Sequence, residues 1–124
     1  MKTCLIVDDS SVIRKVARRI LEDLSFQISE ASDGEEAMKA CDKQMPDAIL
    51  LDANMPVMDG YDFLIKLRKQ PDGEKPIVVF CATENDLTNI TKAMRAGANE
   101  YLLKPFDKEL MEAKFVEAGL IGAA

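Results

Sequence analysis

The chain has 124 residues, of which 48% are hydrophobic and 31% charged, with only 6 Gly and 5 Pro. This composition excludes a disordered, collagen-like or low-complexity chain, and the length suits one globular domain that buries about two thirds of its unfolded surface. A phosphate backbone or an anionic bilayer would repel the formal net charge of −6, so we expect no nucleic acid and no membrane as a direct partner.

Apolar runs of strand length alternate with longer amphipathic stretches along the whole chain. The predicted strands are residues 3–7, 26–31, 48–51, 77–81 and 100–103. The helices that follow them are expected to begin after Ser10 or Ser11, after Asp33-Gly34, near Gly60, at Asn85 or Asp86, and near Asp107. They are expected to end near Leu24, Pro46, Gln70, Gly97 and Ala118.

Helical spacing also predicts which residues face the core. These residues are Val12, Val16, Ala17, Ile20, Leu21, Leu24, Ala37, Met38, Ala40, Cys41, Phe63, Leu64, Leu67, Leu87, Ile90, Ala93, Met94, Leu110, Met111, Phe115 and Val116. Strands that are joined by helices rather than hairpins form a parallel sheet covered on both faces, which is a doubly wound α/β fold. The pattern does not fix the strand order, although the flavodoxin-like order 2-1-3-4-5 is common for five strands.

The three cysteines, Cys4, Cys41 and Cys81, have no paired spacing, and we expect neither a disulfide nor a zinc site. The N-terminus has no secretion signal, and no apolar run approaches about 18 residues, so a cytoplasmic location is predicted. We expect residues 1–124 to form one domain without an output module, with a frayed tail over residues 121–124. Because the chain has no histidine, its chemistry must use carboxylates, hydroxyls or lysine.

Residues with polar side chains follow four of the predicted strands: Asp8-Asp9, Asp52, Thr83 (directly after Ala82) and Lys104. Ligands of open parallel sheets bind at the carboxyl ends of the strands, so these side chains are expected to converge. Three aspartates at one edge would repel one another unless a cation lies among them, and Mg²⁺ suits oxygen ligands completed by a phosphate. Taken singly, each aspartate has the alternative interpretation of a helix cap or turn residue, and Lys104 that of a solvated lysine.

We expect Asp52 to be the nucleophile toward a phosphoryl donor, because it stands alone at the end of the most apolar strand. The adjacent pair Asp8 and Asp9 is better suited to holding the metal. Lys104 supplies a positive charge for a phosphoryl oxygen, and the Thr83 hydroxyl can donate to another.

Three segments resemble the receiver domain of two-component response regulators, particularly the single-domain chemotaxis type. They are LIVDDS at residues 5–10, ILLDANMPVMDG at 49–60 and RAGANEYLLKPF at 95–106. The resemblance covers nearly the whole chain, and it implies the 2-1-3-4-5 order, which is known from that chemotaxis protein rather than derived from the pattern.

The resemblance also implies a role for each matching residue. Asp52 would be phosphorylated, Mg²⁺ would be bound by Asp9, Asp52 and the backbone carbonyl of Asn54, and Asp8 would assist through a water molecule. Lys104 would contact the phosphoryl group, and Pro105 would follow a cis peptide. Tyr101 would be the switch aromatic, whose ring turns inward on activation.

One position departs from the family pattern. The switch Thr or Ser of the family lies 22 residues before the lysine, which is Ala82 here, with Thr83 one place later. We favour Thr83 as the switch hydroxyl, which requires a shifted strand end. With Ala82 in that position, Asp52 could still be phosphorylated while its coupling to Tyr101 is weakened. Asn54 and Asn85 either tune hydrolysis of the aspartyl phosphate or are ordinary loop and cap asparagines.

The sequence thus predicts a stand-alone, monomeric phosphoryl-accepting switch that a sensor histidine kinase phosphorylates on Asp52. It would catalyse its own phosphorylation and dephosphorylation without being a conventional turnover enzyme. Its signal would leave through a protein partner, such as a motor, a phosphotransfer protein or a kinase. The predicted surface is the fourth helix, fifth strand and fifth helix, with Lys92, Arg95, Tyr101 and Lys108.

Two alternatives come from other functional classes. The first is a small Mg²⁺-dependent phosphatase or phosphotransferase with an aspartate nucleophile, for which 124 residues leave little room for a cap over the substrate. The second is a flavodoxin-like cofactor carrier, which Asp8 and Asp9 disfavour because they would repel a flavin phosphate.

Overall fold

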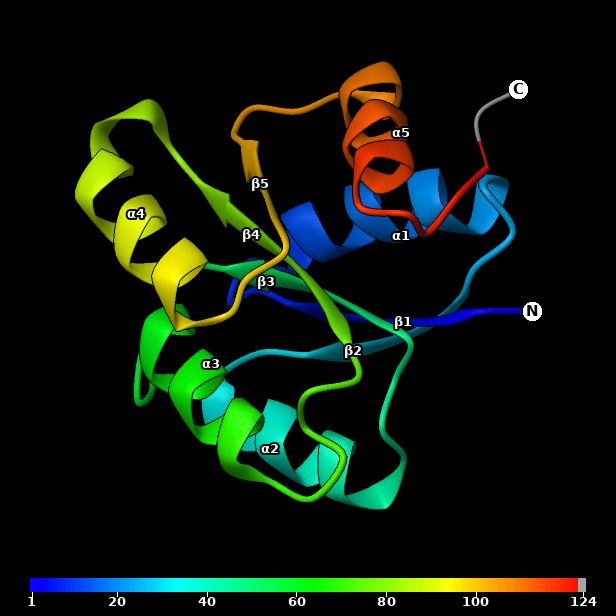
Figure 1. The fold of residues 1–124 in the computed structure, drawn as a ribbon. Coiled ribbons are helices and arrows are strands. Elements are labelled where there is room, and N and C mark those ends of the chain that lie inside the picture. Colours follow the sequence, from blue (N-terminus) through cyan, green and yellow to red (C-terminus); the bar gives the residue numbers. More distant parts are fainter. Residues whose placement is uncertain (123–124) are drawn as a thin grey trace.

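The computed structural model describes residues 1–122, in which strands and helices alternate (Figure 1). The strands are β1 (Thr3–Val7), β2 (Gln27–Ala31), β3 (Ala48–Asp52), β4 (Ile77–Ala82) and β5 (Glu100–Leu103). The helices are α1 (Ser11–Asp23), α2 (Gly34–Lys43), α3 (Gly60–Lys69), α4 (Leu87–Ala96) and α5 (Lys108–Glu117), with a short 3-10 helix, η1 (Glu84–Asp86), before α4. All five predicted strands are confirmed, with ends that differ by at most one residue.

The strands form one parallel sheet in the order β2-β1-β3-β4-β5, so the predicted doubly wound α/β fold is confirmed. Helices α1 and α5 cover one face of this sheet, and α2, α3 and α4 cover the other (Figure 1). Every residue of β3 is buried, because the strand is paired on both edges and covered on both faces. Its carboxyl end therefore lies at the centre of one edge of the sheet.

The core has one layer on each face of the sheet. Phe63 and Phe80 belong to the layer under α2, α3 and α4, and Met111 and Phe115 belong to the layer under α1 and α5. Phe26, which was predicted to open the second strand, precedes β2 and packs edge-on against Phe115, with ring centroids 5.4 Å apart. These layers hold the sheet rigidly under the side chains at its edge.

Most helices begin at a side chain that satisfies a free backbone N–H of the first turn. The side chains of Ser10, Asp33, Asp59 and Asp107 each accept a hydrogen bond from the N–H three residues later. Helix α4 differs, because it continues from η1 and ends at Gly97, which has a left-handed φ of 115°. The predicted helix ends at Ser10 and Gly97 are therefore confirmed by the capping geometry.

Four residues that were predicted to face the core are exposed instead. They are Val12, Val16, Leu87 and Met94, with exposed fractions of 68%, 46%, 65% and 36%. In α1 the buried residues are Ala17, Ile20 and Leu21. Val16 immediately precedes Ala17, and one residue is a rotation of about 100° around the helix, which carries its side chain away from the sheet. The apolar pattern of α1 is thus wider than the face that the sheet covers.

Four further expectations concern the cysteines, the peptide before Pro105, membrane crossing and the C-terminal tail. Cys4, Cys41 and Cys81 are free and buried, and burial raises the pKa of the Cys41 thiol to about 11. The peptide between Lys104 and Pro105 is cis, as the resemblance implied. Within residues 1–122, the helices are too short or too polar to cross a membrane. In the predicted frayed tail, Ile121 packs against the core, and residues 123–124 lie outside the described residues.

Candidate functional site

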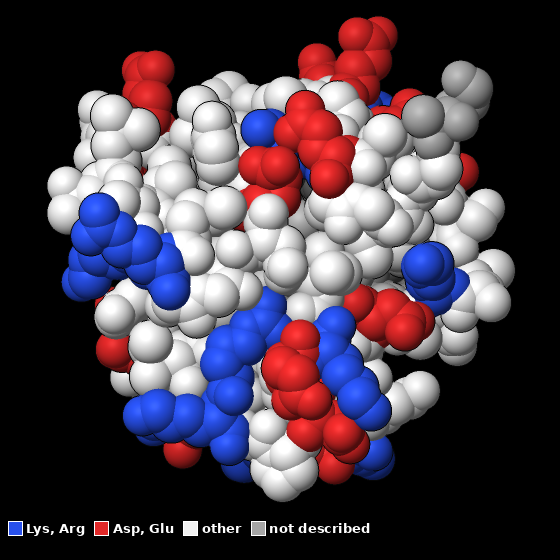
Figure 2. Space-filling view, in the orientation of Figure 1, with Lys and Arg blue, Asp and Glu red and all other residues white. Residues whose placement is uncertain are grey.

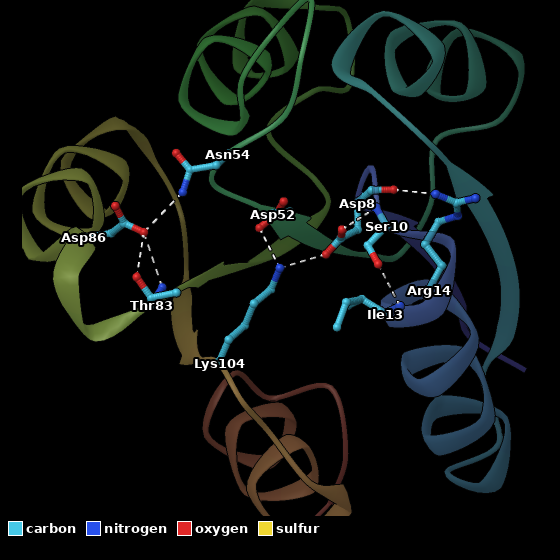
Figure 3. A network of polar contacts seen from close by, with 9 residues as sticks. All are labelled: Asp8, Ser10, Ile13, Arg14, Asp52, Asn54, Thr83, Asp86 and Lys104. Atoms are coloured by element: carbon cyan, nitrogen blue, oxygen red, sulfur yellow. Dashed lines mark hydrogen bonds and ion pairs between the residues drawn. The ribbon is translucent and has the colours of Figure 1, made fainter.

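The polar side chains that follow the strands meet at one edge of the sheet. Val7 of β1 is paired with Leu51 of β3, so Asp8 and Asp52, the next residue in each segment, are neighbours. Lys104 follows β5, and its Nζ lies 2.9 Å from Asp8 Oδ2 and 2.8 Å from Asp52 Oδ1 (Figure 3). The predicted convergence of Asp8, Asp52 and Lys104 is therefore confirmed.

Asp9 completes a group of three carboxylates at this edge. One oxygen each of Asp8, Asp9 and Asp52 lies within 4.8 Å of the others. Asp8 and Asp52 are buried, with exposed fractions of 4% and 6%, whereas Asp9 is exposed. Three carboxylates carry more charge than the ammonium of Lys104 neutralises, and all their donors are hard oxygens. This donor set fits a divalent cation of the Mg²⁺ type.

The backbone and side chain of Asp8 are held in place by α1 and β2. Asp8 Oδ1 accepts a hydrogen bond of 2.9 Å from the N–H of Ser10, and its carbonyl accepts one of 2.6 Å from Arg14 Nη1. Arg14 in turn donates from Nε to Glu30 at the end of β2, at 2.9 Å. The Asp8 carboxylate is thus positioned before any ligand binds. No sequence signal singled out Arg14, since a cation one turn into a helix is ordinary on a solvated face.

For Asp52 and Lys104, burial shifts the pKa in one direction and the hydrogen bond between the two side chains shifts it in the other. Burial raises the pKa of Asp52, the hydrogen bond from Lys104 opposes that rise, and the nearby Asp8 adds to it. Burial works against the charged form of Lys104, but hydrogen bonds to Asp52 and Asp8 outweigh it, so the lysine pKa is raised. Lys104 is therefore cationic at neutral pH, and Asp52 is a carboxylate whose charge is less well stabilised than usual.

The structure contradicts the expectation that Thr83 presents its hydroxyl to Asp52. Strand β4 extends to Ala82, whose carbonyl accepts the N–H of Lys104 at 2.8 Å. Thr83 already lies beyond the strand, and its Oγ1 donates to Asp86 Oδ2 at 3.0 Å, directed away from Asp52 (Figure 3). Ala82, the last residue of β4, therefore occupies the switch position, because the strand ends before Thr83.

Asp86 is a residue that the sequence reasoning did not select for the site. Its Oδ2 also accepts a hydrogen bond of 3.2 Å from Asn54 Nδ2, so it joins the loop after Asp52 to the segment before α4. The Thr-x-x-Asp spacing of residues 83–86, which is typical of a helix start, was the available signal. Asn85 is exposed on the same short helix.

Tyr101 lies on β5 with an exposed fraction of 36%, and its ring is contacted by a side chain of α5. The ammonium of Lys114 lies 4.2 Å from the centre of the ring and pairs with Glu100 Oε1 at 3.5 Å. Glu100 Oε1 also accepts the N–H of Tyr101 at 3.0 Å. The ring is thus held outward by a cation–π contact that the sequence reasoning did not predict.

All four residues named for the predicted partner surface are exposed, and three of them contact other side chains. Lys92 lies over the ring of Tyr61 in α3, 4.5 Å from its centre, and Lys108 pairs with Asp23 of α1 at 3.8 Å. Arg95 is exposed on α4. Figure 2 shows basic side chains gathered over α4 at the left of the view, whereas both charges lie close together over α2 and α3 at the bottom. The predicted surface is therefore exposed, with Lys92 and Arg95 on α4 and Lys108 at the start of α5.

The family profile of the response regulator receiver domain matches residues 4–115. The chain belongs to this family. Receivers are the phosphorylation-controlled domains of two-component response regulators and bind Mg²⁺ at an acidic site, with which the cluster of Asp8, Asp9 and Asp52 is consistent. The receiver is 38% identical over 110 residues to a probable chemotaxis protein CheY of Rhizobium etli, covering 88% of this chain and 85% of that protein.

Other similar proteins are longer. The receiver is 38% identical over 110 residues to the probable transcriptional regulator ycf27 of Guillardia theta, covering 89% of this chain and 42% of that protein. It spans less than half the length of the several ycf27 proteins that it matches. Its similarity to them concerns one part of each protein.

Solved structures agree with the fold. The receiver superimposes on chemotaxis protein CheY4 of Vibrio cholerae with a TM-score of 0.89 and 31% identity, covering 95% of this chain and 98% of that one. The receiver domain of sensor histidine kinase PA1611 from Pseudomonas aeruginosa gives a TM-score of 0.84 and 29% identity, covering 95% and 98%. That protein has a magnesium ion coordinated in its active site cleft.

Proposed function

We propose that this receiver accepts a phosphoryl group on Asp52 from a sensor histidine kinase and thereby changes the surface by which it binds a partner protein. One observation carries the proposal. Lys104 bridges Asp8 and Asp52, at 2.9 and 2.8 Å, beside a third carboxylate, and Asp52 ends the buried central strand. A structural ion pair would not require the surplus carboxylates, whereas a phosphoryl-accepting site does.

The chemistry follows from the positions of the residues. An Asp52 oxygen would form a bond to phosphorus while the bond between phosphorus and the histidine nitrogen of the kinase breaks, and the electron pair returns to the imidazole. Lys104 would donate to the transferred group, because its ammonium already lies at Asp52 Oδ1. Asp8, Asp9, Asp52 and the backbone carbonyl of Asn54 would hold Mg²⁺, which supplies charge neutralisation for phosphoryl transfer.

An apolar pocket of about 250 Å³ adjoins the site. Ile13 and Val16 of α1, Pro105 and Phe106 after β5, and Lys104 line it, together with Thr83. We propose that a partner that brings a phosphohistidine to Asp52 approaches over this surface. The exposed Val16 and the pocket give such a partner an apolar area to contact beside the charged site.

We expect the change to be read through four exposed residues, Lys92, Arg95, Tyr101 and Lys108. The receiver would not turn over stable phosphate esters but would promote its own phosphorylation and dephosphorylation. Asn54 and Asn85, both exposed near the site, would tune hydrolysis of the aspartyl phosphate by controlling the approach of water. A phosphatase assay with small esters separates this function from a conventional enzyme, for which many turnovers are expected.

The test is labelling with ³²P-labelled acetyl phosphate and Mg²⁺. We expect an acid-stable, base-labile label that is lost in Asp52→Asn and on chelation of Mg²⁺. Asp72→Asn is a matched control, because Asp72 is an exposed turn residue with a left-handed φ of 63° that asparagine also tolerates. Full labelling of the Asp52→Asn variant would refute the proposal.

A second experiment examines the partner surface. The wild-type receiver, with and without beryllofluoride and Mg²⁺, is used as bait, and partners retained only with beryllofluoride are identified by mass spectrometry. Arg95→Ala and Tyr101→Ala should reduce that retention. Equal binding of partners with and without beryllofluoride would argue against this surface. Equal binding of partners to the two variants and to wild type would also argue against it.

A further inference from the structure

One carboxylate oxygen connects the two loops that border the site. Asp86 Oδ2 accepts hydrogen bonds from Asn54 Nδ2 at 3.2 Å, from Thr83 Oγ1 at 3.0 Å and from the N–H of Thr83 at 3.4 Å (Figure 3). Thr83 and Asp86 belong to the same turn, so their contacts are local. Asn54 is 32 residues away in the sequence, and its contact joins separate loops.

Both ends of this connection have a useful position. Asn54 is two residues after Asp52, within the loop that leads from β3 to α3. Asp86 immediately precedes Leu87, the first residue of α4, and its side chain does not cap that helix. A displacement of the Asn54 backbone therefore acts, through one side-chain hydrogen bond, on the beginning of α4.

The switch hydroxyl of the family is missing from its usual position here, which is Ala82. Ala82 is buried at the end of β4 and has no side-chain donor, and the Thr83 hydroxyl is used by Asp86. A group bound at Asp52 consequently finds no hydroxyl of β4 facing it. The hydrogen bond from Asn54 to Asp86 instead connects the site to the segment before α4.

We propose that Asp86 is the positioning residue through which α4 responds to the state of Asp52 in this receiver, by way of Asn54. The inference rests on the proposed function, since it concerns what happens when Asp52 is modified. Modification moves the loop at Asn54, the hydrogen bond transmits the movement to Asp86, and the start of α4 shifts with the exposed Leu87. A hydrogen bond to a charged but partly exposed acceptor suffices for a change of up to about tenfold in the balance of two α4 positions.

The experiment compares the amide NMR shifts of the whole protein before and after addition of beryllofluoride with Mg²⁺. The variants are Asp86→Ala, Asn54→Ala and the double variant, with Asp86→Asn as the conservative change, because its amide oxygen can still accept from Asn54. Thr88→Ala is the matched control, since Thr88 is exposed in the first turn of α4. Thermal melting confirms that each variant is folded.

We expect Asp86→Ala and Asn54→Ala each to reduce the response of residues 87–96 by severalfold while residues next to Asp52 still respond. The double variant should show no further loss, and Asp86→Asn should keep most of the response. Wild-type behaviour of α4 in both single variants, or additive losses in the double variant, would overturn the inference. If the wild-type protein shows no response next to Asp52, the proposed function itself fails and the inference fails with it.

Discussion

At the scale of single residues, Asp52 is the group on which burial and charge compete most directly. Its pKa is raised by burial, so the folded state holds a proton on Asp52 more tightly than the unfolded chain does. Its contribution to stability is therefore present below the unfolded pKa and is lost as the pH rises through the folded value. In the metal-free protein at neutral pH, the Asp52 carboxylate costs stability.

The raised pKa of Asp52 leads to a prediction about Mg²⁺ binding. A proton on Asp52 competes with the cation, so the apparent affinity for Mg²⁺ should fall as the pH is lowered through the raised pKa of Asp52. Asp52→Asn should raise the free energy of unfolding of the metal-free protein and remove the gain on adding Mg²⁺. Urea unfolding at several pH values, with and without Mg²⁺, measures both effects. An Asp52→Asn variant that is less stable than metal-free wild type at neutral pH would contradict the inference that the Asp52 carboxylate lowers stability.

Lys104 is predicted to contribute to stability as well as to phosphorylation. Its side chain, 20% exposed, bridges two buried carboxylates, so Lys104→Met should cost about 1–3 kcal/mol in the metal-free protein at neutral pH. The difference from wild type should shrink on acidification, because protonation of Asp52 relieves the repulsion, and also on adding Mg²⁺. Denaturant unfolding of variant and wild type measures this difference. A difference that is constant with pH would rule out the carboxylates as its cause.

At the scale of elements, Arg68 joins α3 to the end of α4 and to the turn before β4. Its guanidinium donates to the carbonyls of Gly97, Gly73 and Pro76, at distances of 2.6 to 3.2 Å. Burial lowers its pKa, and these bonds replace the lost water. Arg68→Ala should cost about 2–4 kcal/mol of stability, because several carbonyls lose their donor. The exposed Lys69→Ala is the control, and equal melting temperatures of the two variants would contradict the account.

Lys114 connects α5 to β5 through the ring of Tyr101. Lys114→Met keeps the length of the side chain but removes the cation, so we expect the Tyr101 ring to leave its outward position more often, by about two- to fivefold. The NMR signals of ring-labelled tyrosine report this change, and Tyr61 serves as an internal reference. Unchanged Tyr101 signals would show that packing alone holds the ring.

The elements show what the sequence could predict and what it could not. Strand periodicity and capping residues such as Ser10 and Gly97 are local signals, so the order of elements and most of their ends were predictable. The meeting of Asp8, Asp52 and Lys104 followed from the rule that parallel strands end at a common edge. The direction of the Thr83 hydroxyl depends on where β4 ends, and the Asn54–Asp86 bond joins distant loops, so neither could be read from local pattern.

At the scale of the whole molecule, the fold places a rigid charged site on one edge and leaves apolar side chains exposed around it. The site lies on central strands held by two core layers, whereas Val12, Val16 and Leu87 lie on the helices beside it. This separation suits a domain whose chemistry is fixed while its contacts with other proteins change. The stand-alone organisation, the monomeric state and the cytoplasmic location stay predictions.

The central claim is that Asp52 carries the phosphoryl group with the help of a cation. Borohydride reduces an aspartyl phosphate to homoserine, and peptide mass spectrometry then locates the modified position. After treatment with acetyl phosphate and Mg²⁺, homoserine should replace aspartate at position 52, and it should be absent when Mg²⁺ is chelated. Homoserine at position 8 or 9 instead, or none at position 52 in the presence of Mg²⁺, would contradict the account.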